Sequence, residues 1–174
     1  MKKTVIILAI VITILSLNKE KKVLIPKKSI RFRVIADSNQ KEDQYIKKEV
    51  VNNLKNKISK LEFSNSLRDN RRKIRKQIPE FKQVVEDTLS KNNYNKTYNI
   101  NYGMNYFPEK EYKGTVYKEG DYESLVITLG DGLGKNFWCV LFPPLCLLEA
   151  EDQKQLDNVE YSSFIKEVID KYFK

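Results

Sequence analysis

The side chains that could carry chemistry in this chain of 174 residues are carboxylates and two cysteines, because the sequence contains no histidine. Without histidine there is no Ser-His-Asp or Cys-His catalytic group, and no imidazole base titrates near neutral pH. Two cysteines alone cannot complete a four-cysteine zinc site or hold an iron–sulfur cluster. We therefore expect no metal site and no cofactor, and the composition argues against an enzyme.

Carboxylates are numerous in the second half of the chain. Two of them could act as the acid and base of a secreted hydrolase that cleaves peptidoglycan or protein. No segment resembles a hydrolase motif, so we keep this activity as the alternative function. The candidate side chains are Glu109, Glu111, Asp121, Glu123, Asp131 and Glu149.

Cys139 and Cys146 flank an apolar segment that contains two prolines. In a cytosolic protein they would be buried core thiols, whereas in an exported protein a disulfide is favoured. The prolines help the segment to fold back, and closing so short a loop would stabilise the fold by roughly 2.5 kcal/mol on the chain-entropy account. We expect a disulfide, with free core thiols as the alternative. A redox role is not expected, because no obvious cation is placed to lower a thiol pKa.

Residues 130–136 form a glycine-rich segment, Gly-Asp-Gly-Leu-Gly-Lys-Asn, that follows a strand-like pattern. It fails the P-loop spacing, and a dinucleotide fingerprint would have to open a helix. The next residues, 137–140, have the pattern of a strand instead. We therefore predict a hairpin loop and no phosphate site.

The net charge of +9 is unevenly placed, because the first 97 residues carry all of the positive excess. Residues 68–76 hold six positive charges against one negative charge. Such a run is typical of a solvated helix face, and together with residues 19–33 it would also suit anionic lipid headgroups. We expect a solvated helix face, with an anionic membrane surface as the alternative partner, and no nucleic acid, because an exported protein rarely meets nucleic acid.

Residues 1–17 consist of a short basic start followed by an almost wholly apolar stretch. As a helix this stretch would span roughly 20 Å, which is short against the roughly 30 Å of a bilayer core. It is therefore expected to be a signal peptide or a short N-terminal anchor. Residues 18–174 would then form a single extracytoplasmic domain.

Hydrophobic periodicity predicts the elements that position these side chains. Residues 30–36 alternate as a half-buried strand does, with Arg31 and Arg33 on the outer side. Two long helices with apolar stripes follow, at about residues 42–61 and 66–91, with a bend or break near Pro79. The later segments with strand periodicity cover residues 98–102, 122–129 and 137–142, the last as a candidate central strand, before a C-terminal helix near residues 164–172. This order predicts an α+β domain with a mostly antiparallel sheet.

Four blocks of the chain resemble, in order, the motifs of the stage II sporulation protein R family. The string Asn-Phe-Trp-Cys-Val-Leu-Phe-Pro-Pro-Leu-Cys is the most specific of them, and a hydrophobic leader precedes all four. The chain departs from the pattern in having Asp37 before Ser38 and Phe137 before Trp138, where Asn and a second Trp are expected. The blocks are residues 25–38 with 43–44, residues 105–112, residues 120–130 and residues 136–146.

The resemblance implies a role that composition could not supply. Members of the family are made in the forespore of endospore-forming bacteria and are exported into the space between the forespore and mother-cell membranes. There they activate a membrane-embedded aspartic protease that processes pro-sigma-E to sigma-E in the mother cell. The resemblance therefore implies that this chain is a secreted signal, with the extracytoplasmic region of the protease as its partner.

The aromatic and proline-bearing loops are the expected contact with that partner, because aromatic anchors concentrate binding energy at interfaces. The alternative is that these residues are simply core and turn. The predicted partner-binding residues are Tyr106, Phe107, Pro108, Trp138, Pro143 and Pro144.

Overall fold

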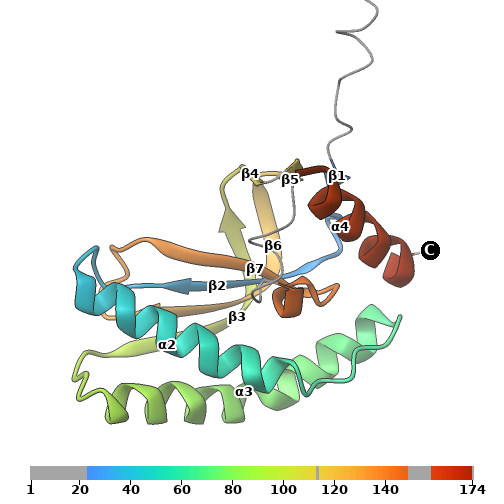
Figure 1. The fold of residues 1–174 in the computed structure, drawn as a ribbon. Helices are drawn as coiled ribbons and strands as arrows, with labels where there is room; N and C mark the ends of the chain where they lie inside the picture. Colours follow the sequence, from blue (N-terminus) through green and yellow to red (C-terminus); the bar gives the residue numbers. More distant parts are fainter. Residues whose placement is uncertain (1–22, 113, 149–157, 174) are drawn as a thin grey trace, which may run out of the picture.

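The computed structural model describes residues 23–112, 114–148 and 158–173 of the chain, and the predicted leader at residues 1–17 lies outside these ranges. Two long helices lie side by side on one face of a four-stranded sheet, and a small sheet and the C-terminal helix lie on the opposite side (Figure 1). The predicted α+β domain, with a helix pair after the first long strand and a C-terminal helix, is confirmed.

The four-stranded sheet has the order β3-β6-β2-β7, in which β2 is parallel to β6 and antiparallel to β7. A small sheet has the order β1-β5-β4. The strands of the larger sheet are β2 (Ile30–Ile35), β3 (Tyr98–Phe107), β6 (Gly120–Leu129) and β7 (Asn136–Phe142). Those of the smaller sheet are β1 (Val23–Leu24), β4 (Lys110–Tyr112) and β5 (Thr115–Tyr117).

The expectation that residues 137–142 form a central strand is wrong, because β7 is an edge strand and β2 and β6 occupy the centre. The strand is nevertheless apolar because both of its faces are covered. Leu141 packs into the core beneath the helices, whereas Val140 packs with Leu145 and Ile165 on the other side. The apolar run of residues 137–142 therefore indicates that both faces of the strand are buried, and it does not indicate that the strand lies at the centre of the sheet.

The helix pair consists of α2 (Lys41–Ile58) and α3 (Leu67–Lys91). The apolar stripe of each helix faces the sheet, so that Ile46 and Leu54 of α2 and Phe81 of α3 are buried against Phe32 of β2 and its neighbours. The Ser66 hydroxyl caps α3 by accepting a hydrogen bond from the Asp69 amide. The helix runs through Pro79 without a break, so of the two predicted alternatives the break does not occur.

The face of the four-stranded sheet opposite the helices, which we call the outer face, carries the alternate residues of β2. Arg31 and Arg33 lie on this outer side as predicted, but only 2% of the Arg31 surface is exposed, so the strand is covered on both faces and is not half-buried. The reason is that Tyr122 and Phe107 cover this arginine from β6 and β3. Alternation in the sequence could not show this cover, because it comes from segments about 80 residues away.

Residues 130–135 connect β6 to β7 across the end of β2, so they are a crossing loop and not the predicted hairpin. The Leu133 amide donates to the Asp37 carbonyl at 2.8 Å, and the Gly134 amide donates to the Ala36 carbonyl at 2.9 Å. A Cβ atom at Gly134 would collide with the Ser38 carbonyl, and Gly130 has a φ of 54°. The glycines are therefore needed for a close backbone approach and a left-handed turn, not for a phosphate.

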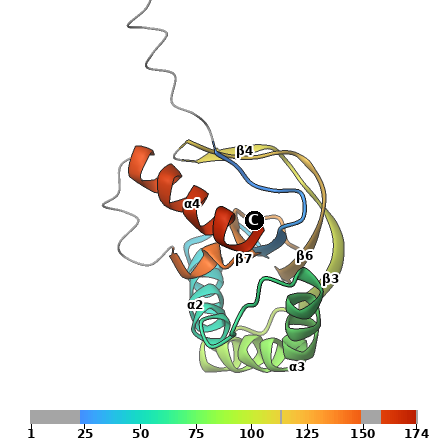
Figure 2. The same ribbon diagram turned by 90° about the vertical axis from the view of Figure 1, so that its right-hand side faces the viewer.

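α4 (Asn158–Phe173) lies on the side opposite the helix pair, as Figure 2 shows, and the short 3₁₀ helix η1 (Leu145–Leu148) follows β7 and contacts α2. Ile165 of α4 is buried in a small cluster with Ile25 and Leu145, which holds α4 beside β1. Within the described ranges, no helix has the length and apolar character needed to cross a membrane.

Candidate functional site

The β3–β6 ribbon extends past the end of β2 and brings aromatic side chains over the outer face. Phe107, the last residue of β3, pairs with Gly120, whereas β2 pairs with β6 only from Ser124 onward. The Phe107 ring therefore reaches Trp138 of β7, with the two ring centroids 5.2 Å apart in an edge-to-face arrangement. Two strands at opposite edges of the sheet thus meet through their aromatic side chains.

These rings border a pocket of about 250 Å³ between β7 and the small sheet, which we call the aromatic pocket. Its walls come from β3, β4, β5 and β7, and Arg31 of β2 lies among its lining residues. Pro108 and Tyr112 are exposed and belong to its rim. The other principal side chains of the lining are Phe107, Lys110, Tyr117, Phe137 and Trp138.

Arg31 is the most unusual residue of this pocket, because it is a buried cation that forms no ion pair with any carboxylate of the described residues. Its Cζ atom lies 3.3 Å from the ring centroid of Tyr122 and 5.2 Å from that of Phe107. Its Nη2 donates to the Lys118 carbonyl at 3.2 Å, while its Nε is buried without a hydrogen-bond partner. Burial lowers the pKa of Arg31, but a guanidinium stays protonated in a protein.

Trp138, the single tryptophan of the chain, is half-buried at the pocket and interacts with two further cations. The Cζ atom of Arg33 lies 4.4 Å from its ring centroid, and the Nζ atom of Lys110 lies 5.3 Å from it. Both distances are within the range of cation–π contacts. The pocket therefore combines aromatic walls with a positive electrostatic environment.

Cys139 and Cys146 are paired in a disulfide, with Cα atoms 5.4 Å apart, as disulfides require. Cys139 also lines the pocket, and both cysteines are buried. The bond joins β7 to the start of η1. It therefore fixes the strand that carries Trp138.

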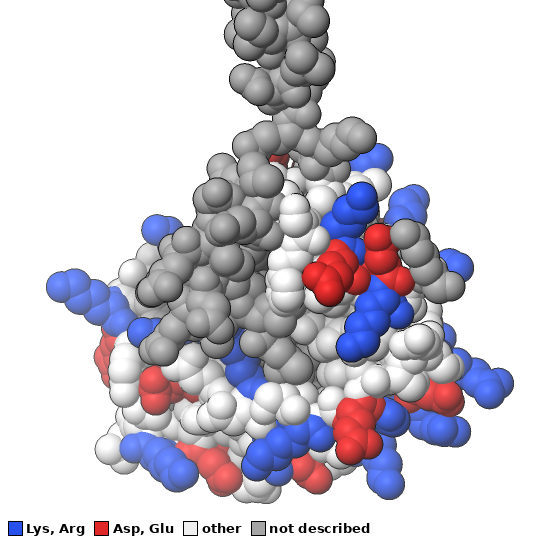
Figure 3. Space-filling view, turned by 45° about the vertical axis from the view of Figure 1, so that its right-hand side comes forward, with Lys and Arg blue, Asp and Glu red and all other residues white. Residues whose placement is uncertain are grey.

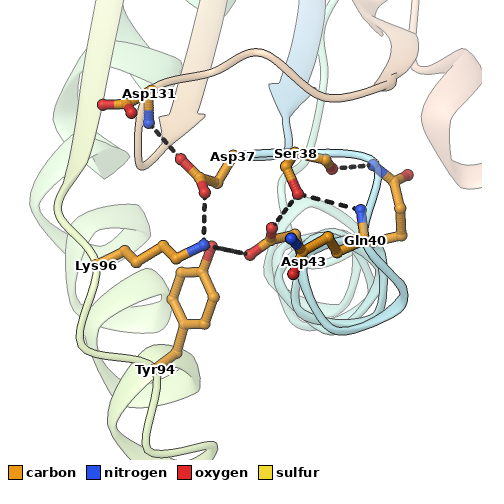
Figure 4. Close-up of polar contacts among 8 residues, drawn as sticks. Asp37, Ser38, Gln40, Asp43, Tyr94, Lys96 and Asp131 are labelled. Atoms are coloured by element: carbon orange, nitrogen blue, oxygen red, sulfur yellow. Dashed lines mark hydrogen bonds and ion pairs between the residues drawn. The ribbon is translucent and has the colours of Figure 1, made fainter.

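A second group of charged residues lies at the opposite end of β2, where Asp37, Ser38, Asp43, Tyr94 and Lys96 form what we call the polar cluster (Figure 4). Asp43, in the first turn of α2, is 2% exposed and accepts hydrogen bonds from the Ser38 hydroxyl, the Tyr94 hydroxyl at 2.7 Å and the Lys96 ammonium at 3.0 Å. Burial alone would raise the pKa of Asp43, but these donors outweigh burial and lower it to about 2.

Asp37 completes the polar cluster from the end of β2. It accepts hydrogen bonds from Lys96 at 2.5 Å and from the Asp131 amide at 2.6 Å, and the bond from Lys96 is the main reason that its pKa is lowered. The polar cluster thus ties β2, α2, the segment before β3 and the crossing loop together. Because its charges are paired with one another, we assign it a structural role.

The geometry of both regions lies within residues 26–152, which match the family model described as stage II sporulation protein R. The chain belongs to the stage II sporulation protein R family. Stage II sporulation protein R of Bacillus subtilis (strain 168) is 36% identical to it over 174 aligned positions, which cover 92% of this chain and 78% of that relative. No solved structure matches the chain significantly. The resemblance drawn from the four sequence blocks is confirmed, and membership of the family supports a role in sporulation.

The structure brings together three of the six residues predicted for partner binding. Phe107, Pro108 and Trp138 all line the aromatic pocket. Tyr106 points to the other side of β3, where it is 57% exposed. The remaining two, Pro143 and Pro144, lie in the turn between β7 and η1. Sequence reasoning missed Arg31, which it had placed on an exposed face.

The basic run of α3 is divided between the surface and the sheet in this member of the stage II sporulation protein R family. Arg71 points to the sheet and forms a two-pronged ion pair with Glu123, with N–O distances of 2.6 and 2.7 Å. Arg68, Arg72 and Lys76 are exposed, as a solvated helix face requires. On the face drawn in Figure 3, lysine and arginine are more frequent than acidic side chains, but acidic side chains lie between them, so they form no continuous basic area. Membrane binding stays a prediction.

Glu123, one of the candidate carboxylates of the second half, does not have the environment that a general acid needs. Burial would raise the pKa of Glu123, but its bonds with Arg71 and Tyr102 lower it instead. Among the described residues, no group of three or more acidic or cysteine side chains is arranged to hold a metal ion. Glu149 lies outside the described residues. The hydrolase alternative therefore gains no support, and the family's name is not that of an enzyme.

Proposed function

We propose that this chain is an exported sporulation signal that activates a membrane-embedded aspartic protease. In this proposal the chain acts in the space between the forespore and mother-cell membranes and binds the extracytoplasmic part of the protease. The protease then processes pro-sigma-E to sigma-E in the mother cell. The chain itself performs no bond cleavage.

The observation that carries the proposal is the convergence of separate family motifs on the aromatic pocket. Residues 25–38, 105–112 and 136–146 each contribute side chains to its lining, although they are far apart in the sequence. Core packing alone does not require an opening rimmed by exposed residues such as Pro108, Lys110 and Tyr112. Aromatic side chains in such a place are typical anchors of protein interfaces.

Activation by binding requires that the chain prefer the active state of the protease. To raise the active fraction of the protease from about 1% to about 99%, the chain must bind the active state about 10⁴-fold more tightly than the inactive state. A ligand with equal affinity for both states would change nothing. The pocket should therefore contact a part of the protease that differs between its two states.

The test is to co-express the full chain with the protease and pro-sigma-E in a host that lacks other sporulation proteins. Tyr112→Ser removes an aromatic rim residue that is 50% exposed, and Tyr45→Ser removes a tyrosine of α2 that is 53% exposed and far from the pocket. At equal protein level we expect Tyr112→Ser to reduce cleavage at least fivefold and Tyr45→Ser to leave it unchanged.

Two outcomes would contradict the proposal at different points. If the wild-type chain does not increase cleavage, the signalling function is wrong. If the wild-type chain is active and Tyr112→Ser behaves as Tyr45→Ser does, the function holds but the aromatic pocket is not its contact surface.

A further inference from the structure

We infer that the aromatic pocket is a carboxylate-binding site, in which Arg31 receives an acidic side chain of a protein partner. The identity of that partner as the protease rests on the function proposed above. The carboxylate specificity of the pocket does not rest on that function, because the specificity follows from the surroundings of Arg31.

The first argument is that Arg31 is buried but incompletely satisfied. One face of its guanidinium is covered by Tyr122, Nη2 bonds a single backbone carbonyl, and the buried Nε donates to nothing. A buried cation is costly unless a counterion or further hydrogen bonds compensate it. Arg71 of the same chain, by contrast, forms a two-pronged ion pair with Glu123. Among the described residues no carboxylate pairs with Arg31, so an acidic group that enters the pocket would meet an uncompensated guanidinium.

The second argument is the shape and charge of the space beside Arg31. The guanidinium fork matches a carboxylate in two-pronged geometry, and Lys110 adds a second cation at the rim, partly offset by Glu111. The volume of about 250 Å³ is below the roughly 300–1,000 Å³ of sites for drug-sized ligands. It suits one amino-acid side chain whose methylene groups pack against Phe107 and Trp138.

The position of Trp138 offers a direct binding assay, because it is the only tryptophan in the sequence. We would titrate the full chain in detergent with N-acetylglutamate α-methylamide, with its glutamine counterpart and with acetate at constant ionic strength. We expect a saturable fluorescence change with the glutamate probe and at least tenfold weaker binding of the glutamine probe. Equal binding of both would overturn the inference. Acetate that binds as tightly as the glutamate probe would reassign the site to free small carboxylates and overturn it as well.

Substitutions then test the two cations. Arg31→Lys keeps the charge but loses the fork, so probe affinity should fall at least about tenfold. Because a buried substitution can impair folding, Lys110→Gln provides an exposed variant, with an expected fall of about two- to fivefold. Lys48→Gln, an exposed lysine on α2, is the control and should have no effect. Unchanged affinity in both pocket variants would overturn the inference.

Residues 149–157 lie outside the described ranges, and their acidic residues provide a control for carboxylates of the chain itself. These residues are Glu149, Glu151, Asp152 and Asp157. We expect their joint replacement by Gln and Asn to leave probe affinity unchanged. A tenfold gain in affinity would show that the chain's own carboxylates occupy the site, and it would overturn the assignment to a partner.

The co-expression assay identifies the partner's side chain. Each extracytoplasmic Asp or Glu of the protease is neutralised in turn and combined with Arg31→Lys. One neutralised position should lower cleavage as much as Arg31→Lys does, and the double variant should show no further loss, because both changes remove the same interaction. If the losses of cleavage caused by the two single changes simply add in the double variant at every position, the inference is wrong.

The two proposals fail in distinguishable ways. If the chain binds the glutamate probe through Arg31 but does not raise cleavage, the signalling function is wrong and the carboxylate site stands. If cleavage rises and Arg31→Lys behaves as the wild type in both assays, the site is wrong and the signalling function stands.

Discussion

Asp43 and Arg31 lie near opposite ends of β2, and each is only 2% exposed, yet their charges have different surroundings. Asp43 accepts hydrogen bonds from a hydroxyl, a phenol and an ammonium group. Arg31 has aromatic rings and one carbonyl oxygen around it, with one nitrogen left unused. The difference distinguishes Asp43, whose charge is paired within the fold, from Arg31, whose charge is available to a binding partner.

The polar cluster and the aromatic pocket also differ in what they contribute to the fold. The polar cluster holds β2, α2 and two connecting segments in place, so its residues serve the fold whether or not a partner is bound. The aromatic pocket depends on the same strand, but within the described part of the chain it adds no ion pair to that strand. Stability and recognition should therefore respond to different substitutions.

The largest effect is expected from Asp43→Ala. It leaves the buried Tyr94 hydroxyl and part of the Lys96 charge without their acceptor, so we expect a loss of about 3 kcal/mol in the free energy of unfolding. Urea denaturation followed by circular dichroism would measure it. Glu42→Ala, an exposed acid in the same helical turn, is the matched control and should cost less than about 1 kcal/mol. Similar losses in the two variants would contradict the structural role of the polar cluster.

A smaller effect is expected from acid. The pKa of Asp43 is about 2 in the folded chain, against an ordinary value of about 3.9, so the folded state binds fewer protons than the unfolded state between these values. The stabilisation is fully present above about pH 4 and is lost as the pH falls toward 2. Asp37 and Glu123, whose pKa values are also lowered, act in the same direction.

Urea midpoints at several pH values between 6 and 2.5 would test this dependence. The difference in unfolding free energy between the wild type and Asp43→Ala should shrink as the pH falls. A difference that stays constant down to pH 2.5 would show that the Asp43 charge does not contribute.

The smallest effect on stability is expected from Arg31→Met, although it should abolish carboxylate binding. Methionine fills a similar volume and removes an uncompensated buried charge, so the free energy of unfolding should stay within about 1 kcal/mol of the wild type. The same denaturation series would measure it. A loss as large as that of Asp43→Ala would erase the contrast between the two charges and make Arg31 a structural residue.

The local elements of this fold could be predicted from the sequence because each is encoded by neighbouring residues. The stripe Ile46, Val50, Leu54 and Ile58 predicts α2, and Ser66 marks the start of α3. The pairing between strands is encoded less directly. Nothing near residues 130–136 shows that β2 will lie between the two strands that this loop connects.

The candidate site was predictable only in its aromatic part. Phe107 and Trp138 attract attention as large apolar residues in specific motifs, and both line the aromatic pocket. Arg31 could not be found in this way, because alternation placed it toward solvent and its cover comes from Phe107 and Tyr122. Its burial is a property of the curved β3–β6 ribbon and not of its own segment.

The central place of β2 has a consequence for the order in which the chain can fold. This strand precedes the helices, but its partners are residues 124–128 and residues 136–142. Helices α2 and α3 can form early from local contacts, while the sheet that they cover must wait for the last third of the chain. A fragment that ends at residue 97 would contain the first long strand and the complete helix pair, and it would still have no sheet on which to fold.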